Sequence, residues 1–163
     1  MFHIGQKAVA NTNPHIVNRK AHFNYAIEEK FECGLVLKGW EAKSVRAGRV
    51  QIGDSHVYEY GGELWLCNAH MNPTDEISTH EKANPTRTRK VLMHKKEIMR
   101  LIGRIERQGY ALIPLDLHFS KGRVKVTLAL AKGKREFEKR ADESKREWER
   151  DRQRLMKTKA RGS

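Results

Sequence analysis

The sequence lacks the features that mark zinc proteins, secreted proteins and membrane proteins. It contains two cysteines, Cys33 and Cys67, with no C-x-x-C pair, which argues against a zinc finger and predicts two buried free thiols. No segment is long and apolar enough to span a bilayer, and residues 1–14 lack the pattern of a signal peptide. We therefore expect a cytoplasmic protein with no metal site and no cofactor.

Catalytic motifs are absent as well. The chain has no H-E-x-x-H, G-x-S-x-G, P-loop or G-x-G-x-x-G motif. Its eight histidines show no metal-ligand spacing with cysteines or carboxylates, and the carboxylates are scattered. We therefore predict that the protein is not an enzyme. An RNA-modifying or RNA-processing enzyme remains the alternative.

What the chain does have is positive charge. Its 163 residues include 33 Lys and Arg against 20 Asp and Glu, for a formal net charge of +13. Phosphates attract clustered Lys and Arg because binding releases condensed counterions, so nucleic acid is the favoured partner. A basic protein without a polyanionic partner is the alternative interpretation.

Alternating apolar residues predict a mainly β domain. In residues 25–37 one parity is apolar and the other is largely charged, so we expect a strand whose core face comprises Ile27, Phe31, Cys33, Leu35 and Leu37. Gly34 suggests a bulge or a sharp bend in this strand. Further strands are expected at 50–60, 63–70, 110–119 and 123–131. Short antiparallel strands with tight glycine turns favour a small closed β-barrel of the oligonucleotide-binding type with added helices.

In the strand expected at 110–119, the odd-numbered side chains from Ala111 to Phe119 are predicted to share the core face. Two helices are predicted beside the strands. WEAKSVRAG, residues 40–48, contains good helix formers and ends in glycine, and residues 94–108 carry apolar side chains at helical spacing. Residues 71–89 are expected to form a long irregular connection with a basic end.

The composition changes near residue 131. We therefore divide the chain into a β-barrel domain, residues 1–131, and a basic tail, residues 132–163. The tail has 13 Lys and Arg against 7 Asp and Glu, and its apolar residues Ala141, Trp148 and Leu155 recur every seven positions. Such a stripe is too narrow to pack against the domain, so we expect a tail that is disordered in the free protein and helical on a polyanion.

Five blocks of the sequence are long and unusual. They are NRKAHFNYAIEEKFECGLVLKGWEAKSVRAG, GDSHV, PTRTRKVLMHKKEI, LAKGKREFEKR and REWERDRQRLMK. Together they resemble the bacterial SsrA-binding protein family, small protein B, in register from Asn18 to Met156. The resemblance implies a non-enzymatic RNA-binding factor of trans-translation. Such a factor binds the tRNA-like domain of transfer-messenger RNA and delivers it to ribosomes stalled on a message that lacks a stop codon, where the nascent peptide is tagged.

The resemblance further implies how the two parts of the chain are used. The barrel would lie near the decoding centre of the small ribosomal subunit, and the tail would become helical in the empty mRNA channel. Elongation factor Tu would be an indirect partner through the charged transfer-messenger RNA. A generic ribosomal RNA-binding protein is the alternative within the same class.

Two sets of candidate residues follow. The RNA-binding set is Asn18, Arg19, Lys20, Tyr25, Glu32, Lys43, Arg46, Arg89, Lys90, Leu92 and Lys125. The ribosome-binding tail set is Lys132, Lys134, Phe137, Glu138, Lys139, Arg140, Trp148, Arg152, Leu155, Met156 and Lys157. Glu32 lies on the outward parity, where a carboxylate accepts hydrogen bonds from a base edge, although an exposed strand residue or a salt-bridge partner fits equally well. Phe137 occupies a position where the family often has His or Tyr, so it can stack on a base but cannot donate a hydrogen bond.

Overall fold

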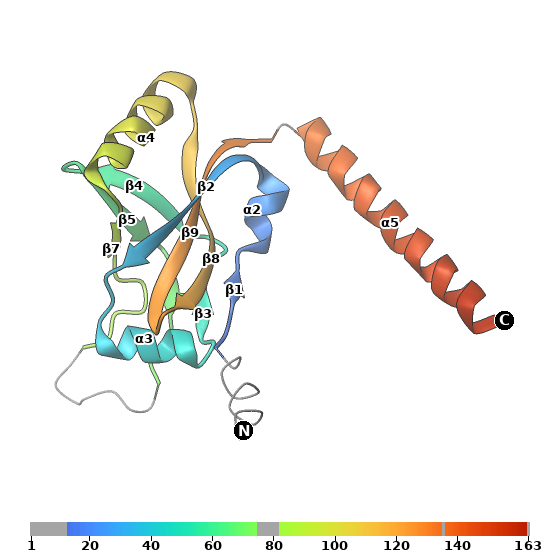
Figure 1. Cartoon of the computed structure of the whole chain (residues 1–163), viewed down its shortest axis with the longest axis horizontal. Helices are drawn as coiled ribbons and strands as arrows, with labels where there is room; N and C mark the ends of the chain where they lie inside the picture. The colour runs from blue at the N-terminus through green and yellow to red at the C-terminus, as the bar shows by residue number, and fades with distance from the viewer. Residues whose placement is uncertain (1–12, 75–81, 135, 163) are drawn as a thin grey trace, which may run out of the picture.

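The structure is a computed structural model that describes residues 13–74, 82–134 and 136–162 (Figure 1). The side chains of Glu136, Phe137 and residues 159–162 lie outside the described part. The strands are β1 (Ile16–Val17), β2 (Tyr25–Leu35), β3 (Val50–Gln51), β4 (His56–Tyr60), β5 (Glu63–Cys67), β6 (His70–Met71), β7 (Arg89–Leu92), β8 (Ala111–Ser120) and β9 (Arg123–Gly133). The helices are α2 (Arg19–Asn24), α3 (Gly39–Arg46), α4 (Lys95–Gln108) and α5 (Glu136–Gly162).

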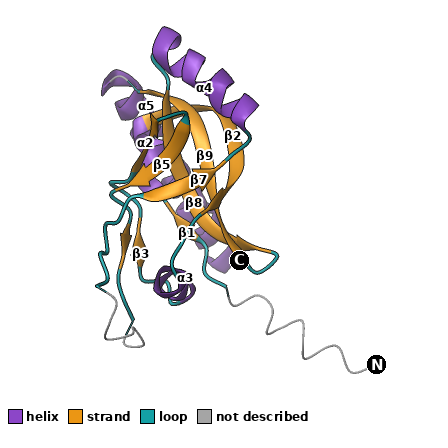
Figure 2. Ribbon diagram, turned by 90° about the vertical axis from the view of Figure 1, so that its left-hand side faces the viewer, coloured by secondary structure: helices purple, strands orange, loops and turns teal. Residues whose placement is uncertain are grey.

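The larger sheet closes on itself. Its strand order is β1-β8-β4-β5-β7-β2-β9, and β8 also pairs with β9, so the strands form a barrel-like antiparallel ring. Strands β3 and β6 form a separate two-stranded sheet. Helices α4 and α3 lie at opposite ends of the ring in both views (Figures 1 and 2). The ring confirms the closed β architecture that the alternation predicted.

Cys33 and Leu35 of β2 are buried in the main core inside the ring, as predicted. Ile27 was expected on the same face but packs in a second cluster, because the register of β2 shifts after it. The predicted bulge lies elsewhere, because the register of β2 with β9 shifts between Ile27 and Glu29 and not at Gly34. Gly34 instead allows a close approach, since an added Cβ would lie 3.2 Å from the Cβ of Leu92. The glycine therefore permits the close contact between β2 and β7.

Strand β8 has two buried faces, so the prediction that its odd-numbered residues share one core face was wrong. Leu112 and Leu117 pack in the main core inside the ring, whereas Ile113 and Leu115 pack in a second cluster that includes Ala21 of α2. The register of β8 with β9 shifts between Pro114 and Asp116, which reverses the inward parity. Asp116 and His118 consequently lie on the outer, partly exposed side of β8.

The strand predicted at residues 50–60 is divided into β3 and β4. A turn separates them, in which the amide and the hydroxyl of Ser55 both donate to the carbonyl of Ile52, at 3.1 and 2.6 Å. The predicted hairpin turns are confirmed, with positive φ values of 62° and 77° at Gly61 and Gly62. Strand β7 was not predicted, since residues 89–92 were assigned to the end of a loop and to the segment after it. It pairs with β2 on one side and with β5 on the other.

Both predicted helices are confirmed as α3 and α4, and α4 ends at Gly109 with a φ of 69° in the left-handed region. Helix α2 was not predicted, and Asn18 caps its N-terminus. Of the two predicted buried thiols, Cys33 is buried, whereas Cys67 is only partly buried on the outer face of β5. Burial raises the pKa of the Cys33 thiol to about 12.

In this structure the tail forms helix α5. Strand β9 continues through Gly133, where it pairs with Tyr25, and α5 then projects away from the ring (Figure 1). The Nζ of Lys134 donates to the carbonyl of His22 at 3.1 Å and forms an ion pair with Asp142, which anchors the start of α5. Among the helices described, none combines the length and apolar character needed to cross a membrane.

Candidate nucleic-acid interface

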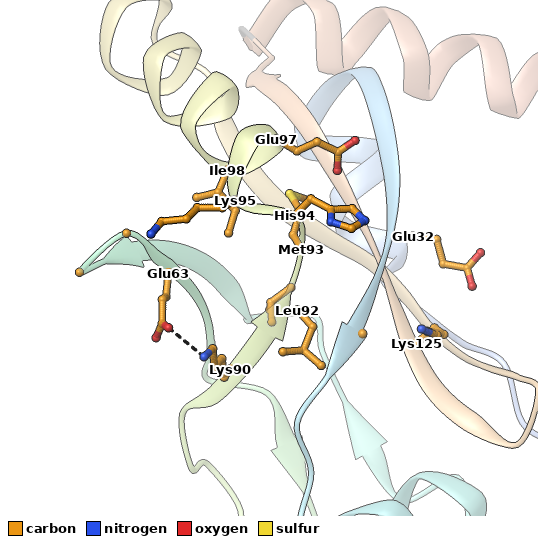
Figure 3. Close-up of a pocket in the computed structure, with 14 residues that line it drawn as sticks. Glu32, Glu63, Lys90, Leu92, Met93, His94, Lys95, Glu97, Ile98 and Lys125 are labelled. Carbon is orange, nitrogen blue, oxygen red and sulfur yellow. Dashed lines mark hydrogen bonds and ion pairs between the residues drawn. The ribbon is translucent and has the colours of Figure 1, made fainter.

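A cleft of about 630 Å³ lies between β2, β7, β9 and the N-terminal end of α4. It is lined by four residues of the predicted RNA-binding set, namely Glu32, Lys90, Leu92 and Lys125 (Figure 3). Strand pairing explains why they meet, because Gly34 of β2 pairs with Leu92 on one side and with Lys125 on the other. Residues that are far apart in the chain thus form one wall.

The cleft carries both signs of charge. Glu32, Glu63 and Glu97 line it together with the three lysines Lys90, Lys95 and Lys125. The Nζ of Lys90 lies 2.8 Å from Oε1 of Glu63, which leaves Lys90 partly neutralised (Figure 3). A wall with equal numbers of acids and lysines suits donors and acceptors on base and ribose edges better than it suits a row of phosphates.

Glu32 and Leu92 both reach solvent at this wall. The Glu32 side chain is 54% exposed, and Leu92 is among the exposed large apolar residues at 49%. A carboxylate without a buried partner can accept hydrogen bonds from base N–H groups, and an exposed leucine offers an apolar surface to a base or a ribose. The cleft therefore combines hydrogen-bond acceptors, cations and an apolar contact.

Arg19 and Lys20 lie outside this cleft, in a groove of about 420 Å³ beside β1, β3 and β6. The Nζ of Lys20 forms an exposed ion pair with Asp54 at 3.1 Å. Tyr25 lines a neighbouring hollow of about 470 Å³ that also contains Lys20. Arg19, Lys20 and Tyr25 thus form a second area, with two basic side chains, that phosphates could contact.

Lys43 and Arg46 are exposed on α3 at the end of the ring opposite α4. The guanidinium of Arg46 lies 5.8 Å from the centre of the Phe119 ring at the end of β8. The predicted RNA-binding set is thus spread over the cleft, the groove and α3, and does not form a single pocket.

Two residues of the predicted set are inaccessible. Asn18 is 2% exposed, its Nδ2 donates to the carbonyl of Pro114 at 2.8 Å, and its Oδ1 accepts from the amide of Ala21. Arg89 is 0% exposed and donates to Glu41 and to the carbonyl of Ala69. In this structure neither side chain can reach an RNA phosphate, because its polar atoms are already occupied within the fold.

Sequence reasoning missed the partner of Arg89. Glu41 of α3 is fully buried and accepts hydrogen bonds from Arg87, from Arg89 and from the backbone amide of Lys38. Burial alone would raise the pKa of Glu41, but the hydrogen bonds from Arg87, from the Lys38 amide and from Arg89 lower it below its ordinary value. This network ties α3 to β7 and to the residues just before it.

Sequence reasoning also missed Asp116 and His118 beside Glu32. The Nε2 of His118 lies 3.5 Å from Oε1 of Glu32, and Nδ1 of the same ring lies 2.7 Å from Asp116. No local signal distinguishes these residues, because they become neighbours of Glu32 only through the pairing of β2, β9 and β8. Within the described ranges, no group of three or more His, Cys, Asp or Glu side chains is arranged to hold a metal ion.

The residues of the ribosome-binding tail set lie in two places, at the junction between β9 and α5 and along α5 itself. The Nζ of Lys132 lies 4.6 Å from the centre of the Tyr110 ring, so Lys132 and Lys134 are held by the barrel. Along α5, three large apolar side chains are more than half exposed, at 62% for Trp148, 65% for Leu155 and 62% for Met156. Lys139 is partly buried. The other described charged residues of the tail set are exposed, namely Glu138, Arg140, Arg152 and Lys157. The Phe137 side chain lies outside the described residues.

Comparison with known proteins completes the description. Residues 15–158 match the family model described as SmpB protein. The chain is 54% identical over 145 residues to the SsrA-binding protein of Azoarcus sp., which covers 89% of this chain and 98% of that protein. It is 51% identical over 143 residues to the SsrA-binding protein of Ralstonia nicotianae, with 88% and 97% covered.

A solved structure reported as "tmRNA-SmpB: a journey to the center of the bacterial ribosome" contains a similar chain. The two chains share 42% sequence identity and superpose with a TM-score of 0.62 over 76% of this chain and 86% of the other. Sequence and fold therefore lead to the same family.

Proposed function

Because the chain belongs to the SmpB protein family, we propose that it binds the tRNA-like domain of transfer-messenger RNA and delivers this RNA to stalled ribosomes. It acts in trans-translation as an RNA-binding factor. The observation that carries the proposal is the meeting of Glu32, Leu92 and Lys125, from three separate strands, at one cleft. The net charge of +13 supports a polyanionic partner for the whole chain.

The cleft and the basic groove have different roles in this proposal. Glu32 accepts hydrogen bonds from base N–H groups, Leu92 packs against a base or a ribose, and Lys125 contacts a phosphate. Lys20 and Arg19 in the groove, with Lys43 and Arg46 on α3, add phosphate contacts that strengthen binding without reading sequence. Specificity thus comes from the cleft, and much of the affinity comes from the lysines and arginines around it.

The tail has a separate task. We propose that residues 132–163 enter the empty mRNA channel near the decoding centre, with Trp148, Leu155 and Met156 as the anchoring side of α5. Their exposure supports this role, because three large apolar side chains on an otherwise charged helix have no partner within the described barrel. Elongation factor Tu takes part indirectly through the charged RNA, in the cytoplasm, and the chain itself catalyses no step.

The proposed function is tested by measuring binding to the isolated tRNA-like domain, with ordinary tRNA as competitor, across a salt series. We expect a preference for the tRNA-like domain that persists as salt rises, because base and shape readout depends less on counterion release than phosphate contact does. Equal affinity for both RNAs, falling identically with salt, would contradict the assignment. Mass analysis of the RNA after incubation separates this role from an RNA-modifying enzyme, which would change the mass.

A further inference from the structure

Two rows of side chains cross the outer face of β2, β9 and β8. Thr127 of β9 pairs with Glu32 of β2 and with Asp116 of β8. In the next row, Lys125 of β9 pairs with Gly34 and with His118. His118 and Glu32 therefore lie diagonally opposite each other across β9 on this face.

Asp116 holds the His118 ring in one orientation. Its Oδ1 accepts from the Thr127 hydroxyl at 2.8 Å and lies 2.7 Å from Nδ1 of His118, while Oδ2 lies 3.4 Å from Nε2 of His15. Burial alone would raise the pKa of Asp116, but the hydrogen bonds from His118, Thr127 and His15 lower it. Because the carboxylate carries no proton, Nδ1 of His118 must donate.

The opposite edge of the ring is therefore free to act on Glu32. With Nδ1 donating to Asp116, Nε2 is the other nitrogen of the His118 ring, and it lies 3.5 Å from Oε1 of Glu32. Nε2 donates to this carboxylate in the protonated ring, because only the imidazolium has an N–H on both nitrogens. The His118 side chain is 26% exposed and the Glu32 side chain is 54% exposed, so the contact lies at the rim of the cleft and not in the core. The charged and titratable groups that face the ring are Asp116, His15, Glu32 and Lys125.

We propose that His118 in its protonated form, oriented by Asp116, is a positioning residue that holds the Glu32 carboxylate in the direction needed to accept hydrogen bonds from an RNA base. A flexible glutamate loses side-chain entropy when it binds, and a neighbour that restricts it beforehand reduces this loss. The proposal rests on the proposed function, because it assigns Glu32 to RNA recognition. It adds His118 and Asp116 of β8 to the residues that shape the RNA-binding site, beyond those that line the cleft.

Two matched variants test the proposal. His118→Asn keeps an amide near the position of Nδ1, toward Asp116, but has no atom at the position of Nε2. His118→Gln places an amide nitrogen near Nε2 and so restores a donor toward Glu32. We expect His118→Asn to weaken binding to the tRNA-like domain by about two- to tenfold, the range expected for one hydrogen-bonded contact, and His118→Gln to recover most of the loss.

A double-mutant cycle with Glu32→Ala supplies the decisive readout. If His118 acts through Glu32, the effect of His118→Asn disappears when Glu32 is already alanine. Additive losses in the double variant, or equal losses for the two His118 variants, would overturn the proposal. If His118→Asn fails to fold, Asp116→Asn replaces it in the same cycle. This variant removes the carboxylate that orients the His118 ring, and Asn has nearly the same volume as Asp. Wild-type protein that shows no preference for the tRNA-like domain would contradict the proposed function itself, whatever the cycle shows.

Discussion

Arg89 donates from its Nε to Oε2 of Glu41 across 2.5 Å, and neither side chain is exposed to solvent. Arg87 contacts the same carboxylate from the partly exposed side, and Arg89 also donates to the carbonyls of Ala69 and Pro85. One buried acid thus joins α3 to β7 and to the segment that precedes it. Lys90 is the next residue of β7 and has the opposite environment, since it lines the cleft.

The Glu41–Arg89 pair is expected to be a large contributor to stability. Glu41→Gln leaves Arg89 buried without its counter-charge, so we expect the free energy of unfolding to fall by about 3–5 kcal/mol. Urea unfolding followed by circular dichroism measures the change. Lys90→Met is the matched control, because the exposed Lys90–Glu63 pair contributes about 0–1 kcal/mol. Equal losses of unfolding free energy in the two variants would show that the buried pair contributes no more to stability than the exposed Lys90–Glu63 pair does.

Stability should decrease in acid, and Glu41 should account for part of the decrease. The pKa of Glu41 and that of Asp116 are both lower in the folded protein than their ordinary values. A lowered folded-state pKa gives stability that is fully present above the unfolded pKa, near 4, and is lost as pH falls through the folded pKa. Urea midpoints measured from pH 7 to pH 2 should therefore fall below about pH 5, and Glu41→Gln should show a shallower decrease. A parallel curve for the variant would contradict the prediction.

Local patterns were sufficient for much of the ring but not for β7. Strand β5, most of β2, the even-numbered residues of β9 and helix α4 each present apolar side chains to the main core, and this periodicity predicted them. Ala129 and Ala131 of β9 are buried as well, in the second cluster. Residues 89–92 are a strand because β2 and β5 pair with both edges, and no pattern within four residues carries that information. Because β7 was not predicted, the sequence did not reveal that Arg89 points inward and Lys90 outward. Both were therefore included in the predicted RNA-binding set.

The candidate site was predictable only in part for the same reason. Resemblance to a family supplied Glu32, Leu92 and Lys125, and strand pairing then brought them together in the cleft. The alternation in residues 110–119 placed His118 and Asp116 outward, but their nearness to Glu32 depends on the pairing of β8 with β9 and of β9 with β2, which no local pattern shows. Pairing partners, and not composition, decide which polar side chains become neighbours.

Gly34 should matter more for RNA binding than for stability. A Cβ at this position would lie 3.2 Å from both Cβ and Cδ1 of Leu92, so Gly34→Ala displaces a half-exposed side chain of the cleft wall. We expect a loss of affinity for the tRNA-like domain of at least about threefold, with a change in unfolding free energy below about 1 kcal/mol. Fluorescence anisotropy with labelled RNA and urea unfolding measure the two quantities.

Gly103→Ala is the matched control for this variant. Gly103 lies within α4 and nothing is within 4 Å of an added Cβ, so the substitution should stabilise the helix by about 0.5–1 kcal/mol. Its affinity for RNA should equal that of the wild type. If Gly34→Ala binds as well as Gly103→Ala does, the close approach of β2 to Leu92 plays no part in recognition.

Removing α5 should separate RNA binding from the later step on the ribosome. A chain that ends at Arg140 keeps the whole ring and the cleft but loses Trp148, Leu155 and Met156, together with the Asp142 partner of Lys134. We expect its affinity for the tRNA-like domain to stay within about twofold of the wild type, because no described residue of α5 lines the cleft. Peptide tagging on stalled ribosomes, measured in a reconstituted translation system, should be abolished. The substitutions Trp148→Ala and Leu155→Ala, made in the full-length chain, should reduce tagging while leaving the length and the charge of the tail unchanged. Loss of RNA binding on truncation would show instead that barrel and tail act as one binding surface.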